Sequence, residues 1–288
     1  MTLRVMTLNL AGMEKDWFKG RAERLCAGLS PLQPDVLCLQ EAGIRGGPDF
    51  HHQIALIGEW TNLPISVFIP YGNPEELTSN EQGGVAVLTR WPLLSVEERR
   101  LPPGKYPPDN RVAMFVTIAH PRGAVHICNT HLSWRPDETD VRQTQLYTIL
   151  DRAQDQGWLH SGERFVIMGD LNATEDEPVI DLLERHMIDA YRFHHTDEGC
   201  TWENTNPYSG GYPSPSRRLD YIFVNHGATV VASGRALHTR QWVASDHYAV
   251  WADLQWPLPD TDAHDIVSSM YPLPMAEWPP VGEDAPLG

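Results

Sequence analysis

Short apolar runs rich in β-branched residues recur through most of this chain. Each run is too short for a helix and is bounded by turn-forming or polar residues, the pattern that predicts β-strands. The predicted strands cover residues 3–8, 36–39, 65–69, 84–88, 112–118, 125–129, 165–168, 221–224 and 248–254. The sequence therefore predicts a protein with many strands.

Helical spacing appears between some of these runs. Helices are predicted over residues 21–29, 141–154 and 177–187. In the first two, leucines recur four positions apart, and Pro178 falls in the first turn of the third, where proline is tolerated.

Two short connections between consecutive strands indicate antiparallel hairpins. One turns around Trp91-Pro92 and the other around residues 120–123. Hairpins of this kind do not fit the strict alternation of strand and helix in a barrel, so the pattern favours a layered α/β fold with mixed sheets.

The chain divides into one long domain and a tail. No linker and no repeat of fixed period interrupts residues 1–256, so we expect one domain there. Residues 257–288 contain seven prolines, which exclude a strand or a long helix. This acidic, proline-rich extension could lie on the domain surface or act as a regulatory or partner-binding segment, and its composition does not choose between them.

The charge balance limits the partners of the protein. Lys and Arg number 22 and Asp and Glu 38, a net charge of −16, which argues against a protein that coats long nucleic acid. Six of the acids lie in the tail, where there is no Lys or Arg, which leaves −10 for the preceding 256 residues. No apolar stretch is long enough for a signal peptide or a transmembrane helix, so a cytoplasmic, monomeric protein is the default expectation.

Cysteine spacing predicts neither a zinc site nor a disulfide framework. Cys26, Cys38, Cys128 and Cys200 form no C-x-x-C pair and have no short Cys/His spacing. We expect four buried thiols.

Polar residues occur at the ends of predicted strands in six places. These segments are Thr7-Leu8-Asn9-Leu10, Leu39-Gln40-Glu41, Asn129-Thr130-His131-Leu132, Gly169-Asp170-Leu171-Asn172-Ala173, Arg218-Leu219-Asp220-Tyr221 and Ser245-Asp246-His247-Tyr248. Each alone has a structural explanation, such as a turn or a helix cap. Together they supply four carboxylates, two histidines and two amides, a set that is costly to remove from water without a cation.

The types of ligand indicate the metal and the reaction. Carboxylate and amide oxygens suit Mg²⁺ or Mn²⁺, whereas the Cys and His clusters that Zn²⁺ prefers are absent from the sequence. A hard cation beside histidines is suited to phosphoryl chemistry. The sequence contains no G-x-S-x-G elbow, which would indicate acyl transfer, and no P-loop, which would indicate an NTPase.

In order and spacing, the six segments resemble the motifs of the endonuclease/exonuclease/phosphatase superfamily, which includes deoxyribonuclease I. The resemblance runs from Asn9 to His247. It implies a four-layer α/β/β/α sandwich of two mixed, largely antiparallel sheets with the active site at one end. It also implies hydrolysis of a phosphate ester with Mg²⁺ or Mn²⁺, and we expect that ester to be a phosphodiester.

The same resemblance assigns roles to individual residues. Glu41 matches the family's metal-binding glutamate, with Asn9 and Asp246 near the same metal. Asp170 and Asn172 match the pair that orients and deprotonates the attacking water. Asp220 resembles the carboxylate that holds the last histidine, His247. His131 matches a second histidine that faces the phosphate, and Arg111 resembles a phosphate-binding arginine of the deoxyribonuclease I branch, so Asn9, Arg111, Asn172 and His131 form the expected phosphate-binding set.

Loop composition bears on the substrate. His131 and its neighbours differ from the segment of abasic-site endonucleases but fit the deoxyribonuclease, sphingomyelinase and phosphatase branches equally. Residues 71–82 carry acids and no base, and residues 204–216 are uncharged, so a compact substrate is expected: a small molecule, a lipid headgroup or a nucleic-acid end rather than long nucleic acid. A deoxyribonuclease-like nuclease, a sphingomyelinase- or inositol-phosphatase-like enzyme and a non-catalytic binding protein remain alternatives.

Three tryptophans lie near the motifs. Trp134, Trp202 and Trp242 could stack on a base, line an apolar pocket or simply pack in the fold.

Overall fold

A computed structural model describes residues 2–12, 20–45, 51–72, 81–106, 110–160, 162–211 and 213–257. All but the first residue of the predicted tail, and much of the acidic loop predicted over 71–82, lie outside the described residues. The strands are β1 (Leu3–Asn9), β2 (Val36–Arg45), β3 (His51–His52), β4 (Ile65–Pro70), β5 (Glu81–Thr89), β6 (Leu93–Arg100), β7 (Val112–Ile118), β8 (Val125–His131), β9 (Phe165–Asp170), β10 (Met187–Asp189), β11 (Asp220–Asn225), β12 (Thr229–Ala236) and β13 (Ala249–Gln255). The α-helices are α1 (Ala22–Leu29), α2 (Gln53–Thr61), α3 (Thr139–Asp155) and α4 (Pro178–Glu184), and a 3₁₀ turn covers Ser30–Leu32.

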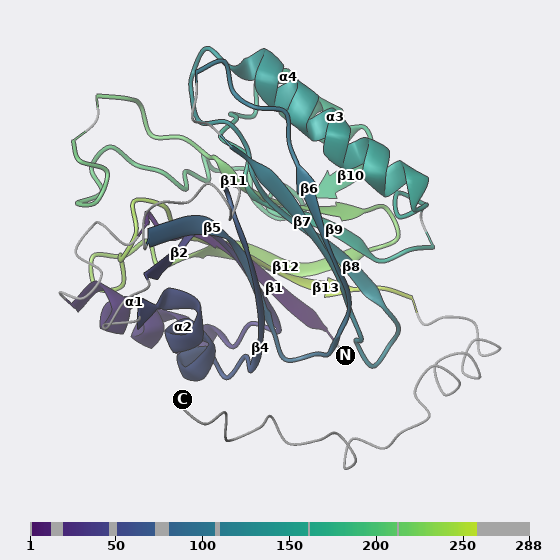
Figure 1. The fold of residues 1–288 in the computed structure, drawn as a ribbon, viewed down its shortest axis with the longest axis horizontal. Coiled ribbons are helices and arrows are strands. Elements are labelled where there is room, and N and C mark those ends of the chain that lie inside the picture. The colour runs from purple at the N-terminus through teal and green to yellow at the C-terminus, as the bar shows by residue number, and fades with distance from the viewer. Residues whose placement is uncertain are drawn as a thin grey trace, which may run out of the picture.

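The strands form two mixed sheets that pack face to face (Figure 1). The seven-stranded sheet has the order β12-β13-β1-β2-β5-β4, with β3 paired to β2, and the six-stranded sheet has the order β10-β11-β9-β8-β7-β6. Each contains one parallel pair, β1 with β2 and β8 with β9, and the other pairs are antiparallel.

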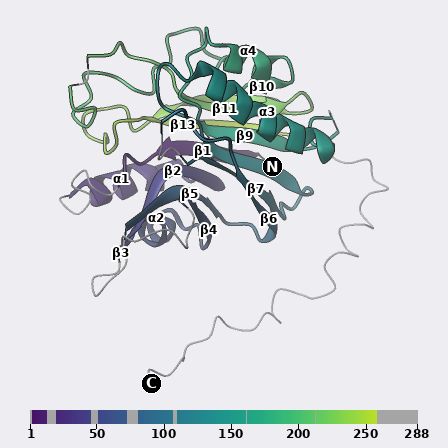
Figure 2. The ribbon, with the colours of Figure 1, turned by 45° about the horizontal axis from the view of Figure 1, so that its top comes forward.

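Helices cover the outer face of each sheet, which completes four layers (Figure 2). One apolar cluster, which includes Val87 and Ile127, lies between the sheets. A second cluster packs α1 and α2 on the seven-stranded sheet, and a third packs α3 and α4 on the six-stranded sheet. The predicted α/β sandwich of two mixed, largely antiparallel sheets is therefore confirmed.

All nine predicted strands are present, with ends that differ by a few residues. The apolar runs did not predict the short strands β3 and β10 or the strands β6 and β12. In β6, which forms an edge of its sheet, six of the eight residues are exposed. Burial on one face only leaves few apolar positions for a run to be recognised.

The predicted hairpin around Trp91-Pro92 is wrong. β5 belongs to the seven-stranded sheet and β6 to the six-stranded sheet, so this turn carries the chain from one sheet to the other. β5 already has β2 and β4 on its two edges and offers β6 no free edge. The hairpin predicted around residues 120–123 is confirmed, since β7 and β8 pair antiparallel on either side of it.

The third predicted helix is too long at its end. α4 stops at Glu184, and Met187 instead begins β10, where it pairs with Asn225 of β11. Pairing to the sheet edge buries Met187 in the same cluster that a longer helix would have reached. Helix α2 was not predicted, although its buried residues, which include Ile54, Ile57 and Thr61, are spaced three and four positions apart along one face.

The four cysteines are buried free thiols, as predicted. Among the described residues, no helix is long and apolar enough to cross a membrane.

Candidate functional site

Strand register brings the six polar segments to one end of the sandwich. His131 and Asp170 are partners where β8 and β9 end side by side. Asp220 begins β11 directly opposite Asp170. In the other sheet, Asn9 ends β1, and His247 lies two residues before the start of β13, which runs antiparallel to β1. Residues from distant parts of the sequence therefore meet at a rigid edge.

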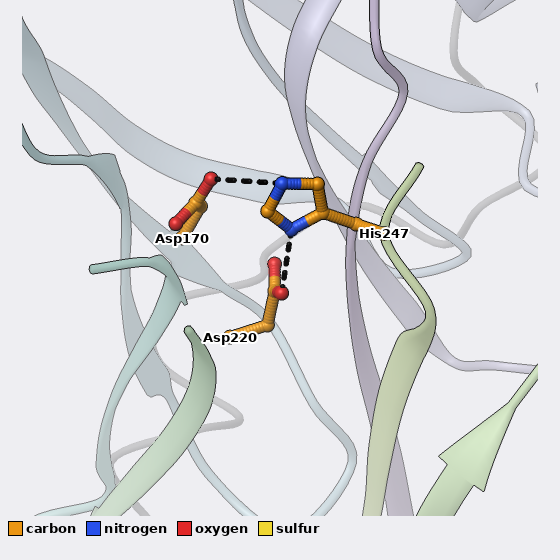
Figure 3. A group of neighbouring side chains, drawn as sticks. All are labelled: Asp170, Asp220 and His247. Carbon is orange, nitrogen blue, oxygen red and sulfur yellow. Dashed lines mark hydrogen bonds and ion pairs between the residues drawn. The ribbon is translucent and has the colours of Figure 1, made fainter. Parts of the chain in front are cut away.

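His247 lies between two aspartates (Figure 3). Its Nδ1 is 2.8 Å from Oδ2 of Asp220, and its Nε2 is 3.7 Å from Oδ2 of Asp170. Burial opposes the charged imidazolium, but the carboxylates of Asp220 and Asp170 outweigh burial and hold the pKa of His247 well above its ordinary value. With both ring nitrogens protonated, each points an N–H at a carboxylate.

His131 has the opposite protonation state. Its Nδ1 is 2.8 Å from the hydroxyl of Tyr71, and its Nε2 is 3.4 Å from Oδ2 of Asp170. Burial, together with repulsion from Arg111 and His247, holds the pKa of His131 well below its ordinary value. Burial also raises the pKa of Tyr71, so its phenol keeps its proton and donates it to Nδ1 of the neutral imidazole. The remaining proton of His131 therefore sits on Nε2 and faces Asp170.

Asp170 is the centre of the arrangement. It is 1% exposed, and burial raises the pKa of its carboxyl to about 7. Its Oδ2 accepts a hydrogen bond from Nδ2 of Asn9 at 2.9 Å, and its Oδ1 accepts one from the backbone N–H of Asn172 at 2.9 Å. Both oxygens of this carboxyl group are held by hydrogen bonds, and its pKa is near neutral pH. It is therefore suited to exchange a proton with a bound water.

Asn9 joins Asp170 to Glu41. The same Nδ2 that reaches Asp170 lies 3.1 Å from Oε1 of Glu41, while Oδ1 of Asn9 accepts the backbone N–H of Ala11 at 2.9 Å. Glu41 has a φ of 50° and sits where the register of β2 against β5 shifts. Such a bulge re-aims a side chain away from the pleat, which directs the Glu41 carboxylate into the site.

Asp246 is held near Asn9 and Glu41 by the residue before it, Ser245. The hydroxyl of Ser245 donates to the backbone oxygen of Asn9 at 2.6 Å and lies 3.4 Å from Oδ1 of Asp246. The loop before β13 is thereby tied to the end of β1, and the half-buried Asp246 is placed at the same edge.

The donors fit a hard divalent cation. Glu41, Asp170, Asp220 and Asp246 offer only oxygen atoms, and among the described residues only histidines form ion pairs with Asp170 and Asp220. Oδ1 of Asp220 is buried and has no hydrogen-bond partner within the described part of the chain. Asp170, Asp220 and His247 are also close enough to share an ion, but both nitrogens of that imidazole already face carboxylates. Glu41 and Asn9 are therefore the residues that could hold a hard divalent cation.

The two other predicted residues have defined surroundings. Asn172, with a φ of 49°, donates its side-chain amide to the backbone oxygen of Leu132 at 3.1 Å, so it also ties the loops after β9 and β8 together. The guanidinium of Arg111 lies 5.7 Å from the ring centre of Tyr71 and within electrostatic reach of His131. Both residues therefore border the site.

Some polar residues of the motifs are structural. Asn129 donates to the backbone oxygens of Leu39 and Ala86 and accepts from Gln40, which joins the two sheets beneath the site. Buried amides satisfied on all sides fix the relative position of the sheets.

Sequence reasoning missed Tyr71. Its hydroxyl lies 2.8 Å from His131 and accepts the backbone N–H of Glu41 at 2.9 Å, so it links the two residues. The sequence names it only as the start of an acidic loop, because a lone tyrosine after a strand has no motif. Tyr71 is far from both His131 and Glu41 in the sequence, so the sequence does not indicate that they are in contact.

The tryptophans differ in their surroundings. Trp202 is buried and forms a β-bridge with His247, and Trp242 packs against the α1 side of the seven-stranded sheet. Packing therefore accounts for both. Trp134 is 50% exposed beyond the end of β8.

Comparison with known proteins agrees with this geometry. The chain is 20% identical over 190 residues to a "Probable CCR4-Not complex 3'-5'-exoribonuclease subunit" from Vairimorpha ceranae, a match that covers 58% of this chain but only 39% of that protein. A crystal structure of an endonuclease/exonuclease/phosphatase from Beutenbergia cavernae is 25% identical, with a TM-score of 0.67 over 90% of this chain and 73% of the other. The human Nocturnin catalytic domain, solved with a bound sulfate anion, is 22% identical, with a TM-score of 0.69 over 89% and 94%.

The sequence model of the Endonuclease/Exonuclease/phosphatase family matches residues 6–247, which include every segment of the site. The fold, the convergence of the six segments and this match lead to one conclusion: the chain belongs to the endonuclease/exonuclease/phosphatase family.

Proposed function

We propose that the protein is a divalent-metal-dependent phosphoesterase that hydrolyses a compact phosphodiester by attack of an activated water. The observation that carries the proposal is the imidazole of His247, held between Asp220 and Asp170 with its Nδ1 2.8 Å from Asp220. A buried, cationic imidazole among carboxylates is suited to stabilise charge on a phosphoryl oxygen and to return a proton.

Each residue has a separate task in this proposal. Asp170 accepts the proton of the attacking water, and Asn172 orients that water while its backbone N–H holds Asp170. Nε2–H of the neutral His131 donates to a phosphoryl oxygen, and Asp220 keeps His247 protonated at Nδ1. Arg111 adds positive charge at the rim, beside Tyr71.

Glu41, with Asn9 and Asp246 beside it, is the set proposed to hold Mg²⁺ or Mn²⁺. When bound there, the cation supplies Lewis-acid polarisation of the phosphoryl group. Within the described residues, Asp170 and Asp220 form ion pairs with histidines and with no arginine or lysine, which supports a cation as part of the balancing charge.

A substrate panel with and without EDTA tests the proposal. The protein is mixed with bis-p-nitrophenyl phosphate, short oligonucleotides, inositol phosphates and sphingomyelin, each with excess Mg²⁺ or Mn²⁺. We expect release of product from at least one phosphodiester, its loss in EDTA and its return when the metal is restored. No release from any substrate, with the metal present and the protein folded, would show that the fold serves binding without catalysis.

A nuclease acting on nucleic-acid ends is a second candidate. It is supported by the exoribonuclease named above and by a stack of side chains just beyond the end of β8. The guanidinium of Arg135 lies 4.8 Å from the ring centre of Trp134 and 4.9 Å from that of Tyr106, and both rings are about half exposed. Exposed aromatic rings beside an arginine are suited to stack on a nucleobase.

The Trp134→Ala variant distinguishes this candidate from a base-independent phosphodiesterase. A nuclease should show a KM for an oligonucleotide raised about tenfold or more, with the KM for bis-p-nitrophenyl phosphate unchanged. Trp60→Ala is the matched control, since Trp60 is equally exposed but lies on α2. Equal effects on both substrates would argue against base stacking.

A further inference from the structure

A cavity of about 650 Å³ opens between α1 and the loops before β13. Its lining includes Arg24 of α1, His238 and Arg240 of the loop before β13, and the buried residues Asn206 and Tyr248. This volume falls within the range of about 300–1,000 Å³ that is usual for small-molecule sites. No role in the proposed hydrolysis involves it.

The charge of this cavity is opposite to that of the protein. Its lining contains two arginines and no carboxylate, although the chain as a whole carries a net charge of −16. Burial lowers the pKa of His238, so this histidine adds a hydrogen-bonding group rather than a charge. Arg24 donates to the hydroxyl of Tyr208 and to the backbone oxygen of Val243. Within the described part of the chain, neither Arg24 nor Arg240 forms an ion pair with an acid. Two arginines without acidic partners give the cavity a positive potential.

The neutral lining residues add hydrogen-bonding groups beside two apolar residues, Pro207 and Val243. Thr205 and Gln241 are exposed at the cavity, and Asn206 is buried in its wall. Guanidinium groups bind phosphate through paired N–H donors, and amides and hydroxyls complete the contacts. The two arginines and these polar residues therefore suit the phosphate group of a ligand, whose remaining part can contact the apolar residues.

Residues in the wall of the cavity also hold the loop of residues 245–247, which we call the catalytic loop. Asn206 donates its side-chain amide to the backbone oxygens of Ser245 and Asp246, at 2.9 and 3.2 Å. Tyr248, which follows His247, donates its backbone N–H to Thr201 and its hydroxyl to Glu203. A ligand in the cavity would therefore contact the residues that position His247.

We propose that this cavity is an accessory site for a phosphate group, bound by Arg24 and Arg240 next to the catalytic loop. The group belongs to a small phosphorylated molecule, which is either free or the non-reacting part of a substrate. This site goes beyond the proposed hydrolysis and does not depend on it, because binding requires neither a metal nor turnover.

Binding is measured by isothermal titration with the full chain in EDTA, which separates it from catalysis. The probes are inorganic phosphate and adenosine monophosphate, with adenosine as the probe that lacks the phosphate. We expect binding of both phosphates, weakened by salt, and none of adenosine. Arg24→Gln and Arg240→Gln should each weaken phosphate binding, and the double variant should weaken it about tenfold or more.

Arg185→Gln is the matched control, because Arg185 is exposed at the end of α4 on the other side of the molecule. Its affinity for phosphate should equal that of the wild type. Unchanged binding in the double variant, or no phosphate binding by the wild type, would overturn the proposal. Binding of adenosine as strong as that of its monophosphate would also overturn it. A loss of phosphoesterase activity would have no bearing on these measurements, so the two proposals fail separately.

A second measurement separates the two sources of the phosphate. If the group is part of a substrate, the double variant raises the KM for substrates with a second phosphate and leaves that for bis-p-nitrophenyl phosphate unchanged. If the molecule is free, adding it changes the rate with bis-p-nitrophenyl phosphate in the wild type but not in the double variant. Either pattern supports the site.

Discussion

The hydroxyl of Tyr71 lies 2.8 Å from Nδ1 of His131, a residue that is 60 positions later in the chain. The same hydroxyl accepts the backbone N–H of Glu41. One phenol thereby fixes the tautomer of a histidine and the position of a carboxylate that are proposed to serve different parts of the reaction.

Tyr71→Phe removes this hydroxyl and keeps the ring. We expect kcat to fall about tenfold, since one buried hydrogen bond that orients a histidine is lost. The rate is measured on the best substrate of the panel, and circular dichroism checks the fold. Tyr147→Phe, at an exposed tyrosine of α3, is the control and should leave kcat unchanged. A Tyr71→Phe variant as active as the wild type would remove the hydroxyl from the proposed mechanism.

Asp220→Asn keeps the shape of the side chain but removes the charge that holds the pKa of His247 high. The imidazole then titrates nearer to neutrality and loses its orientation, so we expect kcat to fall by about 10²- to 10⁴-fold. The measurement is a pH profile of kcat for the variant and the wild type. Asp151→Asn, at an exposed position of α3, should not change the profile. A fall of less than threefold would contradict the role given to Asp220.

Gly169→Ala should prevent stable folding. Gly169 has a φ of 147°, and a Cβ placed on it would lie 1.9 Å from the backbone oxygen of Thr130 on the neighbouring strand. Backbone atoms on adjacent strands have little room to move, so the cost exceeds about 3 kcal/mol. Chemical denaturation measures it. Gly162→Ala is the control, because nothing lies within 4 Å of its Cβ, and it should change the free energy of unfolding by less than about 1 kcal/mol.

Acid should destabilise the protein through His126, which is far from the site. Its ring stacks on Trp158 at 4.7 Å, and burial lowers the pKa of His126 to about 4, below the ordinary value of 6.5. As the pH falls below 6.5, His126 is therefore protonated in the unfolded chain but stays neutral in the folded protein until the pH approaches about 4. Stability consequently falls as the pH falls through this range. Between pH 7 and 5 this histidine contributes a loss of about 1–2 kcal/mol, after allowance for its partial exposure.

His126→Phe preserves the stacked ring and removes the titration. Denaturation at pH 7 and at pH 5 should show a loss of stability that is about 1–2 kcal/mol smaller in the variant than in the wild type. The comparison uses the difference between the two pH values, so any constant effect of the substitution cancels. Equal losses in both proteins would mean that His126 is protonated in the folded state.

The local pattern of apolar residues predicted most strands and helices correctly, but it could not predict which strands pair with one another. The runs of residues 112–118 and 125–129 predict β7 and β8 because strands buried on both faces are apolar throughout. The turn at Trp91-Pro92 has the same local appearance as a hairpin but joins two sheets, since the edges of β5 are occupied by β2 and β4. Which strand lies next to which is a property of the whole fold.

The sequence by itself determined which groups stand at the strand ends. Glu41, Asp170, Asp220 and His247 follow one another in the order of the family's motifs, and this resemblance supplied their expected roles. Tertiary structure decided the state and partners of each group. Tyr71 contacts His131, Asn9 contacts Asp170, and Arg24 and Arg240 line the same cavity only because the fold brings distant segments together. The reason is physical: hydrogen bonds and pKa shifts depend on distance and burial, which the order of residues along a chain does not contain.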